Sequence, residues 1–387
     1  MNIGIFALWG MNIPGVAHGG NESIFSEVAA RLAAKGHRVT IYCRANHYPE
    51  HLRLAQYRGV WLRYVKAIAS KSLSAPSATL LSLLDAFQEN SFDLYFFVNV
   101  GMGFHCALAR MFGKIVALNV DGLDWQRSKW NWLGKAYFRL AARAAMYSCQ
   151  SLVVDSKAMQ RYYRQSFGKE TAYIPYGVDL RSPQDPARLR EFGVEPRGYY
   201  FIASRFVPEN HVDLMIEAFT RSHTERTLLI AGSGYYMGDY TRRLHRTQDP
   251  RVKFLGHVHD QDLFDELMCN CYAYLHGHSV GGTNPVLLRA LGSGACILAL
   301  TTPFNEEVLA GHGLEFSREV GDLKDKIDYI DRHPEVAQDF RDRARDRVEQ
   351  EYTWELCTDG YEKLFLRLVG DSLDSATQEA RSGPSAG

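Results

Sequence analysis

Short apolar runs alternate along this sequence with amphipathic segments of helical length. The first run covers 3–8, a helical pattern follows over 22–35, and a second apolar run covers 39–43. Gly36 ends the helical pattern between the two runs. This alternation is typical of βαβ units, in which helices cover both faces of a parallel sheet. The chain is therefore predicted to be an α/β protein.

The alternation forms two series separated by a connecting segment. Pro183, Pro186 and Pro196 fall within a charged stretch, which indicates a domain connection. Because 387 residues exceed what one hydrophobic core normally serves, two Rossmann-like domains are expected, over 1–180 and 181–353. Further strands are expected over 94–98, 115–120, 151–155, 199–204, 227–231, 252–255, 271–275 and 295–299, with helices over 132–147 and 212–219.

Parallel sheets bind ligands at the carboxyl ends of their strands, so the two domains are expected to face each other across a cleft that holds the site. The C-terminal stretch 371–387 is small, polar and without periodicity, and we expect it to be disordered.

Composition excludes several classes of protein. Forty-four basic residues balance forty-four acidic ones, so no net charge attracts nucleic acid. Cys269 and Cys271 are the only close pair among seven cysteines, and nothing completes a zinc site. Buried free thiols in a reducing cytosol are expected. There is no basic region before the first strand and no run of roughly 18 apolar residues, so a soluble cytoplasmic protein is predicted, one that can still touch a membrane.

Glycine-rich turns follow several of the expected strands. Gly19 and Gly20 precede the first helix, where backbone amides can approach a phosphate or a sugar, although a plain βα loop has the same composition. No G-x-G-x-x-G follows the first strand and no P-loop pattern is present, which disfavours dehydrogenases and P-loop NTPases. Gly232 and Gly234 end a strand of the second half and can let a nucleotide lie against the backbone. Alone, each of these signals is weak.

Arg205 follows the first strand of the second half. Its planar set of hydrogen-bond donors suits a diphosphate; the alternative is an ordinary surface arginine without a ligand.

The most informative segment is 276–294. It leaves an apolar strand, passes through two glycines and enters a helix with asparagine at the cap and proline in the first turn. The free amides before this helix can point at an anion, aided by the helix dipole. A well-capped structural helix is the alternative, but two histidines and a hydroxyl in the loop favour a polar ligand. The residues concerned are His276, His278, Ser279, Gly281, Gly282, Thr283, Asn284 and Pro285.

These segments resemble the nucleotide-binding half of the retaining GT-B glycosyltransferases of the family 4-like group. More narrowly, the chain resembles a bacterial branch that includes rhamnosyltransferases of capsule and O-antigen assembly. The resemblance covers roughly residues 1–370, and the segment 276–285 is its specific part. The other, individually weaker residues are Pro14, Gly19-Gly20-Asn21-Glu22, Asn119-Val120-Asp121-Gly122-Leu123-Asp124-Trp125, Lys129-Trp130, Asp155-Ser156-Lys157-Ala158, Tyr176-Gly177, Pro208-Glu209-Asn210, Pro303-Phe304-Asn305 and Tyr352-Thr353-Trp354.

The resemblance implies a GT-B fold and a metal-independent, retaining transfer from a nucleoside diphosphate sugar, with no further cofactor. It places the donor on the 181–353 domain and the acceptor mostly on the 1–180 domain, and it implies a helix over 354–370 that crosses back to the first domain. The implied reaction is transfer of L-rhamnose from dTDP-rhamnose to a saccharide or a polyprenyl-diphosphate-linked acceptor in surface polysaccharide assembly. A UDP- or GDP-linked glucose or mannose donor and a degenerate, non-catalytic scaffold are the alternatives.

Four positions depart from the family pattern. Gly281 and Arg289 stand where the broad family carries two glutamates, one facing the sugar and the other the ribose; the bacterial branch lacks the first and normally keeps the second. Glu306 stands where that branch usually has arginine, as if the two residues had exchanged places. One hypothesis is that Arg289 pairs with Glu306 while Glu307 stays in the donor site; the other is a weaker or rearranged ribose contact. Asn210 replaces a lysine of many relatives.

Asp121 follows an apolar strand and is the first candidate for orienting the acceptor or the sugar; its alternative role is to stabilise the turn at Gly122. No compelling nucleophile is present, so the protein is expected to stabilise the diphosphate charge and position the reactants. The candidate catalytic residues are Asp121 and Arg205; the candidate donor-binding residues are Gly232, Gly234, His278, Ser279, Gly281, Gly282, Thr283, Asn284, Arg289, Asn210 and Glu307; the candidate acceptor or phosphate loop comprises Gly19, Gly20, Glu22, His105 and Trp125.

The stretch 126–154 contains five basic residues and no acidic one, and Trp125, Trp130 and Trp132 accompany them. Such a mixture suits a helix at an anionic membrane surface, near a lipid-diphosphate acceptor. The segment 126–147 is therefore a candidate for peripheral attachment at the inner face of the plasma membrane. A solvated helix face with core tryptophans has the same composition.

Overall fold

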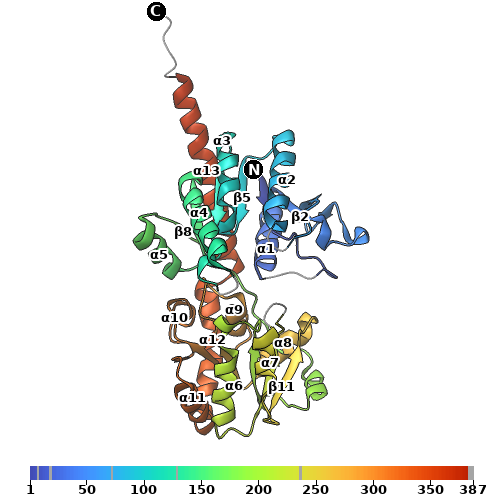
Figure 1. The fold of residues 1–387 in the computed structure, drawn as a ribbon, viewed down its shortest axis with the longest axis vertical. Helices are drawn as coiled ribbons and strands as arrows, with labels where there is room; N and C mark the ends of the chain where they lie inside the picture. Colours follow the sequence, from blue (N-terminus) through green and yellow to red (C-terminus); the bar gives the residue numbers. More distant parts are fainter. Residues whose placement is uncertain (7, 17–19, 71–72, 128–129, 235–237, 382–387) are drawn as a thin grey trace, which may run out of the picture. The chain divides into compact units, whose positions relative to one another are not determined.

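The computed structural model describes residues 1–6, 8–16, 20–70, 73–127, 130–234 and 238–381. The chain forms two compact units (Figure 1). Unit 1 contains Met1–Gln126, Trp130–Gly177 and Trp354–Gly387, and unit 2 contains Val178–Thr353 together with Arg127–Lys129. Each unit is built on a sheet of predominantly parallel strands with helices packed on it, which confirms the predicted α/β class.

The sheet of unit 1 has eight strands in the order β3-β4-β2-β1-β5-β6-β7-β8, and only the β3–β4 pair is antiparallel. All five residues of β5 are buried, as expected for a continuous apolar run covered on both faces. The strands are β1 (Asn2–Phe6), β2 (Arg38–Arg44), β3 (Gln56–Tyr57), β4 (Val60–Val65), β5 (Leu94–Val98), β6 (Val116–Asn119), β7 (Ser151–Val154) and β8 (Ala172–Tyr173).

The helices of unit 1 include one from each end of the chain. α13 (Trp354–Arg381) packs against α1 (Gly20–Ala34), and Lys35 just after α1 pairs with Asp359 at 2.7 Å. The remaining helices are α2 (Ser74–Glu89), α3 (Gly103–Met111), α4 (Trp132–Ser148) and α5 (Lys157–Phe167), with single 3-10 turns at Ala45–His47, Glu50–Leu52, Val100–Met102 and Asp124–Gln126.

The C-terminal helix is longer than the sequence analysis expected. The expectation was a helix over 354–370 and a disordered tail from 371, whereas α13 continues to Arg381. The added stretch contains leucine, alanine and glutamate, which favour helices, and the first helix-breaking residues are Gly383 and Pro384. Residues 382–387 lie outside the described part of the chain.

The sheet of unit 2 has six parallel strands in the order β11-β10-β9-β12-β13-β14. Its core joins the buried side chains of β9 and β10 to α6 and α11. The strands are β9 (Tyr199–Ala203), β10 (Thr227–Ala231), β11 (Val252–Gly256), β12 (Ala273–His276), β13 (Ile297–Leu300) and β14 (Leu314–Phe316). The helices are α6 (Val212–Arg221), α7 (Gly238–Leu244), α8 (Gln261–Asn270), α9 (Pro285–Gly292), α10 (Pro303–Leu309), α11 (Val320–Arg332) and α12 (Pro334–Glu351), with 3-10 turns at Pro186–Phe192 and Pro208–Asn210.

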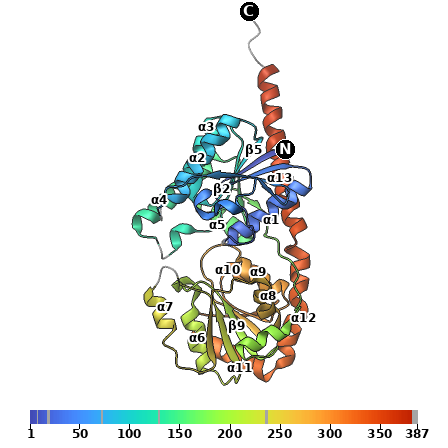
Figure 2. The ribbon, with the colours of Figure 1, turned by 90° about the vertical axis from the view of Figure 1, so that its right-hand side faces the viewer.

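The strands expected from apolar runs are present, most of them within a residue or two of the expected bounds. Within the described residues, all seven cysteines are buried and none forms a disulfide, which confirms the expectation of free thiols. None of the helices described above combines the length and the apolar character that crossing a bilayer requires. The helices on both faces of the two sheets are visible in Figure 2.

Candidate functional site

Three neighbouring strands of unit 2, β10, β9 and β12, end at the same edge of the sheet, and their loops pack on one another. Gly232 follows β10 with a φ of +153°, and a Cβ there would lie 1.8 Å from the carbonyl oxygen of Ser204 in the β9 loop. A Cβ on Gly234 would lie 2.0 Å from Oγ1 of Thr241. Gly232 therefore allows the backbone of the β9 loop to approach, and Gly234 leaves room for the side chain of Thr241 on α7. Contact of either glycine with a ligand stays a prediction.

The β12 loop packs against the same β9 loop. A Cβ on Gly277 would lie 2.3 Å from the carbonyl oxygen of Asn210, so only glycine fits. Ser279 donates from its amide (3.0 Å) and its hydroxyl (2.9 Å) to the carbonyl oxygen of Glu209. His211 bonds through Nδ1 to the carbonyl oxygen of Gly277 at 2.9 Å. These hydrogen bonds fix the two loops relative to each other. Ser279 uses both its amide and its hydroxyl for this structural role.

The β12 loop continues into α9 through the cap that the sequence predicted. The Oδ1 atom of Asn284 accepts a hydrogen bond from the amide of Val286 at 2.9 Å, and Pro285 occupies the first turn. Gly281 has a φ of +122°, which side chains disfavour, and Gly282 and Thr283 are buried. The predicted N-cap is confirmed, and the amides of this turn form a local positive end suited to an anion.

The loops enclose a cavity of about 110 Å³. This is larger than the share of one water molecule, about 30 Å³. Its lining consists of Ala203, Ser204, Arg205, Asn210, Tyr274, Leu275, His276, Gly277, His278, Asn284 and Val286. Four residues of the predicted site, Arg205, Asn210, His278 and Asn284, therefore meet around one space.

Three polar residues of this region were not among the candidate site residues, although His276 and Asn305 lie in the segments that resemble the family. Tyr274 and His276 line the cavity, and Asn305 donates from Nδ2 to the carbonyl oxygens of His278 (3.0 Å) and Leu300 (2.8 Å). The sequence did contain a signal for Tyr274 and His276. Together with His278 they occupy alternate positions along β12 and its extension, and alternate residues lie on one side of a strand.

Burial keeps both cavity histidines neutral. It lowers the pKa of His276 to about 3. It also lowers the pKa of His278 well below its ordinary value, and the positive charge of Arg205 acts in the same direction. Neutral imidazoles are hydrogen-bonding groups with one donor and one acceptor each.

The lowered pKa of His276 predicts that the protein loses stability in mild acid. The unfolded histidine takes up a proton below a pH of about 6.5, whereas the folded one resists protonation down to about pH 3, so the free energy of unfolding falls as the pH drops through this window. Between pH 7.5 and 5.0 the contribution is about 2 kcal/mol. Urea denaturation at both pH values should show a smaller loss for His276→Gln than for the wild type. Equal losses would contradict the assignment.

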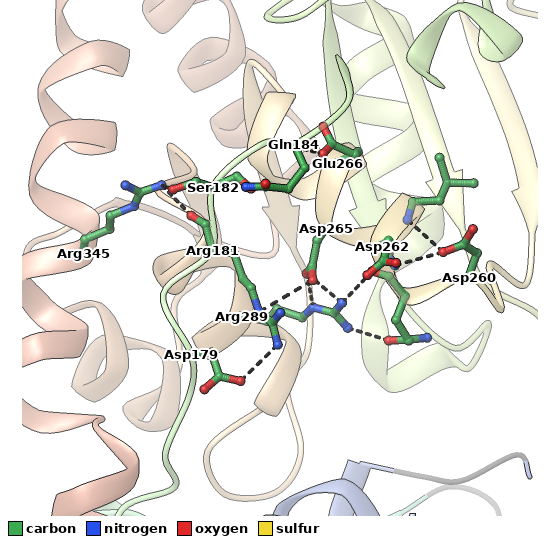
Figure 3. A network of polar contacts seen from close by, with 12 residues as sticks. Asp179, Arg181, Ser182, Gln184, Asp260, Asp262, Asp265, Glu266, Arg289 and Arg345 are labelled. Atoms are coloured by element: carbon green, nitrogen blue, oxygen red, sulfur yellow. Dashed lines mark hydrogen bonds and ion pairs between the residues drawn. The ribbon is translucent and has the colours of Figure 1, made fainter. Parts of the chain in front are cut away.

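Arg289 pairs with Asp265 rather than with Glu306, so the hypothesis of an Arg289–Glu306 pair is wrong. Its guanidinium lies 2.6 Å from Oδ1 of Asp265 (Figure 3). It also donates to Oε1 of Gln261 at 2.8 Å and covers the ring of Phe264. The reason is packing: these three partners lie on α8, which runs beside α9, whereas Glu306 lies on α10.

The same carboxylate of Asp265 also receives Arg181, with Nε 3.6 Å from Oδ2, and the amide of Arg181 donates to the carbonyl oxygen of Gly292 at 2.8 Å. The network in Figure 3 thus ties the segment before Pro186–Phe192 to α8 and α9. The structure gives Arg289 this clamping role, and a role in donor binding stays a prediction, as it does for Glu307 on α10.

A double-mutant cycle separates the two pairings of Arg289. Because the side chains of Arg289 and Asp265 are only 23% and 14% exposed, Arg289→Ala and Asp265→Ala should each lower the free energy of unfolding by about 2 kcal/mol. Their combination should show a coupling of at least about 1 kcal/mol by urea denaturation. The matched cycle of Arg289→Ala with Glu306→Ala should be additive. Coupling in the second cycle and none in the first would restore the rejected hypothesis.

In unit 1, β5 and β6 end in strained residues that meet. Asn99 follows β5 with a φ of +81°, and Asp121 follows β6 with a φ of +65°. Nδ2 of Asn99 donates to Oδ2 of Asp121 at 3.0 Å and to Oδ2 of Asp124 at 2.8 Å. Left-handed backbone at residues other than glycine costs free energy and gathers at functional sites. The sequence identified Asp121 but missed Asn99, the amide that joins the two carboxylates.

The other predicted residues of unit 1 each have a separate structural setting. Glu22 is buried in the first turn of α1, accepts from the amide of Trp9 at 3.3 Å, and has a pKa raised by burial, with the charge of Asp121 adding to the rise. His105 bonds to the carbonyl oxygen of Pro76 at 3.0 Å and so joins α3 to α2. Trp125 is a core residue beside the rings of Tyr162 and Phe167. Gly20 is the first residue of α1, and Gly19 lies outside the described residues.

Known proteins resemble both units. Residues 18–182 match the family model Glycosyltransferase Family 4, and residues 211–358 match the model Glycosyl transferase-like. No curated protein sequence matches the chain.

Solved structures of GT-B glycosyltransferases resemble the chain over nearly its full length. Anabaena HepE in complex with UDP and glucose is 17% identical, with 94% of this chain and 99% of HepE covered and a TM-score of 0.77. Sucrose-phosphate synthase from Thermosynechococcus elongatus is 16% identical, with 96% and 99% covered and a TM-score of 0.81. A glycosyltransferase from Rickettsia africae is 12% identical, with 95% and 98% covered and a TM-score of 0.73. At such identities the likeness establishes the fold, which is GT-B. The family matches add the activity class: the chain is a GT-B glycosyltransferase of the family 4-like group.

Proposed function

We propose that the cavity of unit 2 binds the diphosphate and sugar of a nucleoside diphosphate sugar, and that residues of unit 1 orient the acceptor. The observation that carries this proposal is the meeting of Arg205 with the N-terminus of α9 at one cavity. A guanidinium and the amides of a helix N-terminus are complementary to a diphosphate. Neutral histidines and asparagines beside them provide hydrogen-bonding groups for an uncharged polar ligand.

The proposed reaction is a retaining transfer that needs no metal. The bond between the anomeric carbon and the diphosphate oxygen breaks, and the acceptor hydroxyl attacks from the same face. The proton of that hydroxyl passes to the departing diphosphate. Arg205 and the amides before α9 stabilise the charge that develops on the diphosphate. Asp121, held by Asn99, is proposed to orient the acceptor hydroxyl.

Two donors are proposed for testing. The resemblance of the segment 276–285 to the bacterial rhamnosyltransferases supports dTDP-L-rhamnose, with a saccharide or lipid-linked acceptor of surface polysaccharide assembly. The structural likeness to HepE, which has been solved with UDP-glucose, supports UDP-glucose as the second candidate.

A thermal-shift panel of dTDP, UDP and GDP, each alone and as its sugar conjugate, tests the proposal. Ligand at 100 times its dissociation constant stabilises the folded state by about 2.7 kcal/mol, which raises the melting temperature by several degrees. Transfer by the responding donor is then followed by NMR of the product anomer, with and without EDTA. No response to any nucleotide would contradict the proposal and favour the non-catalytic scaffold, and an inverted anomer would contradict retention.

We also propose an anionic membrane surface as the partner of α3 and α4, which pack together in unit 1 (Figure 2). Trp132 and Tyr147 on α4 are 75% and 91% exposed, and neither helix contains an acidic residue. The exposed large apolar residues of this face are Phe104, Met111, Trp132, Leu133, Leu140 and Tyr147, and its basic residues are Arg110, Lys135, Arg139 and Arg143. Exposed aromatic and basic side chains together favour the interface of an anionic bilayer, which supports peripheral attachment at the inner face of the plasma membrane.

Flotation with vesicles containing phosphatidylserine tests this surface. Each basic residue near an anionic bilayer contributes about 1 kcal/mol, so Arg139→Gln with Arg143→Gln should lower the partition coefficient roughly 25-fold at low salt. Tyr329→Ser and Leu366→Ser, which change exposed side chains elsewhere, are the matched controls. Wild-type protein that stays with the unbound fraction at low salt would contradict the membrane proposal.

A further inference from the structure

His276 lines the cavity of unit 2 and has a ring nitrogen without a hydrogen-bond partner among the described residues. Its side chain is buried, with 4% of the residue exposed, and Nε2 has no partner among the described residues. An unpartnered polar atom inside a protein costs free energy and calls for an explanation, such as a ligand that completes it. The cavity that His276 lines, of about 110 Å³, is large enough for such a ligand.

The neighbours of His276 determine which ring nitrogen carries the proton. The hydroxyl of Tyr274 has a single proton, which it donates to the carbonyl oxygen of Ala203 at 3.2 Å. The oxygen of that hydroxyl lies 3.3 Å from Nδ1 of His276 and must therefore accept. This arrangement favours a proton on Nδ1 of neutral His276 and a lone pair on Nε2.

The ring of His278 also has an acceptor at Nδ1. The amide nitrogen Nδ2 of Asn210 donates to the carbonyl oxygen of Arg205 at 2.9 Å, which identifies its Oδ1 as the acceptor facing Nδ1 of His278 at 2.8 Å. This contact favours a proton on Nδ1 of His278 as well. Its Nε2 lies 3.6 Å from the position that a Cβ of Gly281 would take, so it faces a residue without a side chain.

We propose that His276 and His278 form a pair of acceptors that selects hydroxyl groups of the nucleotide sugar, and that Tyr274 and Asn210 are the positioning residues that fix this state. The two rings lie 6.1 Å apart, centroid to centroid, a separation that suits hydroxyls carried by one sugar ring.

A phosphate oxygen has no proton to offer at neutral pH and would meet a lone pair, so the diphosphate is directed to Arg205 and the start of α9 instead. The hydroxyls can belong to the transferred sugar or to the ribose, and the test separates them. The inference rests on the proposed function, because it names the part of the donor that this cavity recognises.

The protonation states are tested first, without any ligand. Long-range ¹H–¹⁵N correlation spectra of the full-length protein at pH 7 should show both histidines with a protonated Nδ1 and a bare Nε2, with signals assigned by their loss in His276→Gln and His278→Gln. Asn210→Leu should convert the His278 signals to a mixture of tautomers. A proton on Nε2 of either histidine in the wild type would overturn the inference.

Binding is tested by calorimetry with UDP, UDP-glucose, dTDP and dTDP-rhamnose. His276→Phe and His278→Phe should each weaken binding of the nucleotide sugar roughly three- to tenfold, the effect of one hydrogen bond. Binding of the bare nucleotide should change less than twofold if the hydroxyls belong to the transferred sugar, and as much as that of the nucleotide sugar if they belong to the ribose. Glutamine at either position offers an oxygen near the place of Nε2 and should restore part of the loss, which also controls for misfolding of the phenylalanine variants.

Deoxyfluoro analogues identify the hydroxyl, because fluorine cannot donate. The analogue altered at the contacted position should bind the wild type roughly three- to tenfold more weakly and bind the phenylalanine variant without further loss. Loss confined to 2′-deoxyuridine diphosphate would assign the hydroxyls to the ribose and support the acceptor pair. Variants that bind every analogue as the wild type does would overturn it. If the wild type binds no nucleotide at all, the proposed function fails, and the tautomer spectra still decide the state of the two imidazoles.

Discussion

Replacing Arg205 by alanine is expected to lower the kcat of sugar transfer roughly 10²- to 10³-fold. In the proposed reaction the charge that develops on the leaving diphosphate meets this guanidinium, which lines the cavity beside Asn210 and Asn284. The side chain is exposed, and the carbonyl oxygen that anchors Asn210 belongs to its backbone, so the melting temperature should stay within about a degree of the wild type. A continuous assay of nucleoside diphosphate release measures the effect.

Arg205→Lys keeps the charge but loses the planar fork, and its activity should fall between those of alanine and the wild type. Arg246→Ala, which removes an exposed arginine of the same unit, is the matched control. If Arg205→Ala and Arg246→Ala have the same kcat, the diphosphate does not use Arg205 and the proposed donor site is wrong.

Asp121→Asn is expected to lower kcat roughly 100-fold while leaving the dissociation constant of the donor nucleotide unchanged. Asparagine tolerates the φ of +65° at this position, so the substitution removes the charge without straining the backbone. Its loss of activity should therefore come with a wild-type melting temperature. Asp121→Ala should show the same loss of activity together with a destabilisation of about 1 kcal/mol.

The control for Asp121 is Asp93→Asn, at the amino end of β5, where the carboxylate accepts from the amide of Asn2. Measuring kcat, the acceptor KM and nucleotide binding for each variant separates orientation of the acceptor from binding of the donor. A change in nucleotide affinity as large as the change in kcat would move Asp121 out of the acceptor role.

Local patterns were sufficient for the strands that form long apolar runs, but they did not predict β3, β4 and β14 or the helices α2, α3 and α11. The apolar runs of β5, β9 and β10 coincide with the observed strands because each run is long enough to be buried on both faces of a sheet. The cap of α9 was equally legible, because the asparagine that satisfies a free amide lies only two residues from it. The start of α13 was also found, but not its end at Arg381, since helix formers without a packing pattern gave no local signal.

The side-chain partners at the candidate sites were decided only by tertiary structure. Arg289 faces Asp265 because α8 packs beside α9, and no spacing in the sequence distinguishes that carboxylate from Glu306. Asn99 reaches Asp121 because β5 and β6 end side by side in the sheet.

The sequence by itself determined the two α/β units, the strand-to-helix turns and the identity of Arg205, Asp121 and the capped loop before α9. These follow from periodicity and capping, which act between residues close in the chain. Only the tertiary structure brought His276, His278 and Asn210 to one cavity and gave Nδ1 of each imidazole its hydrogen-bond partner. Those features depend on contacts between loops about 70 residues apart, whose geometry the packing of neighbouring strands decides.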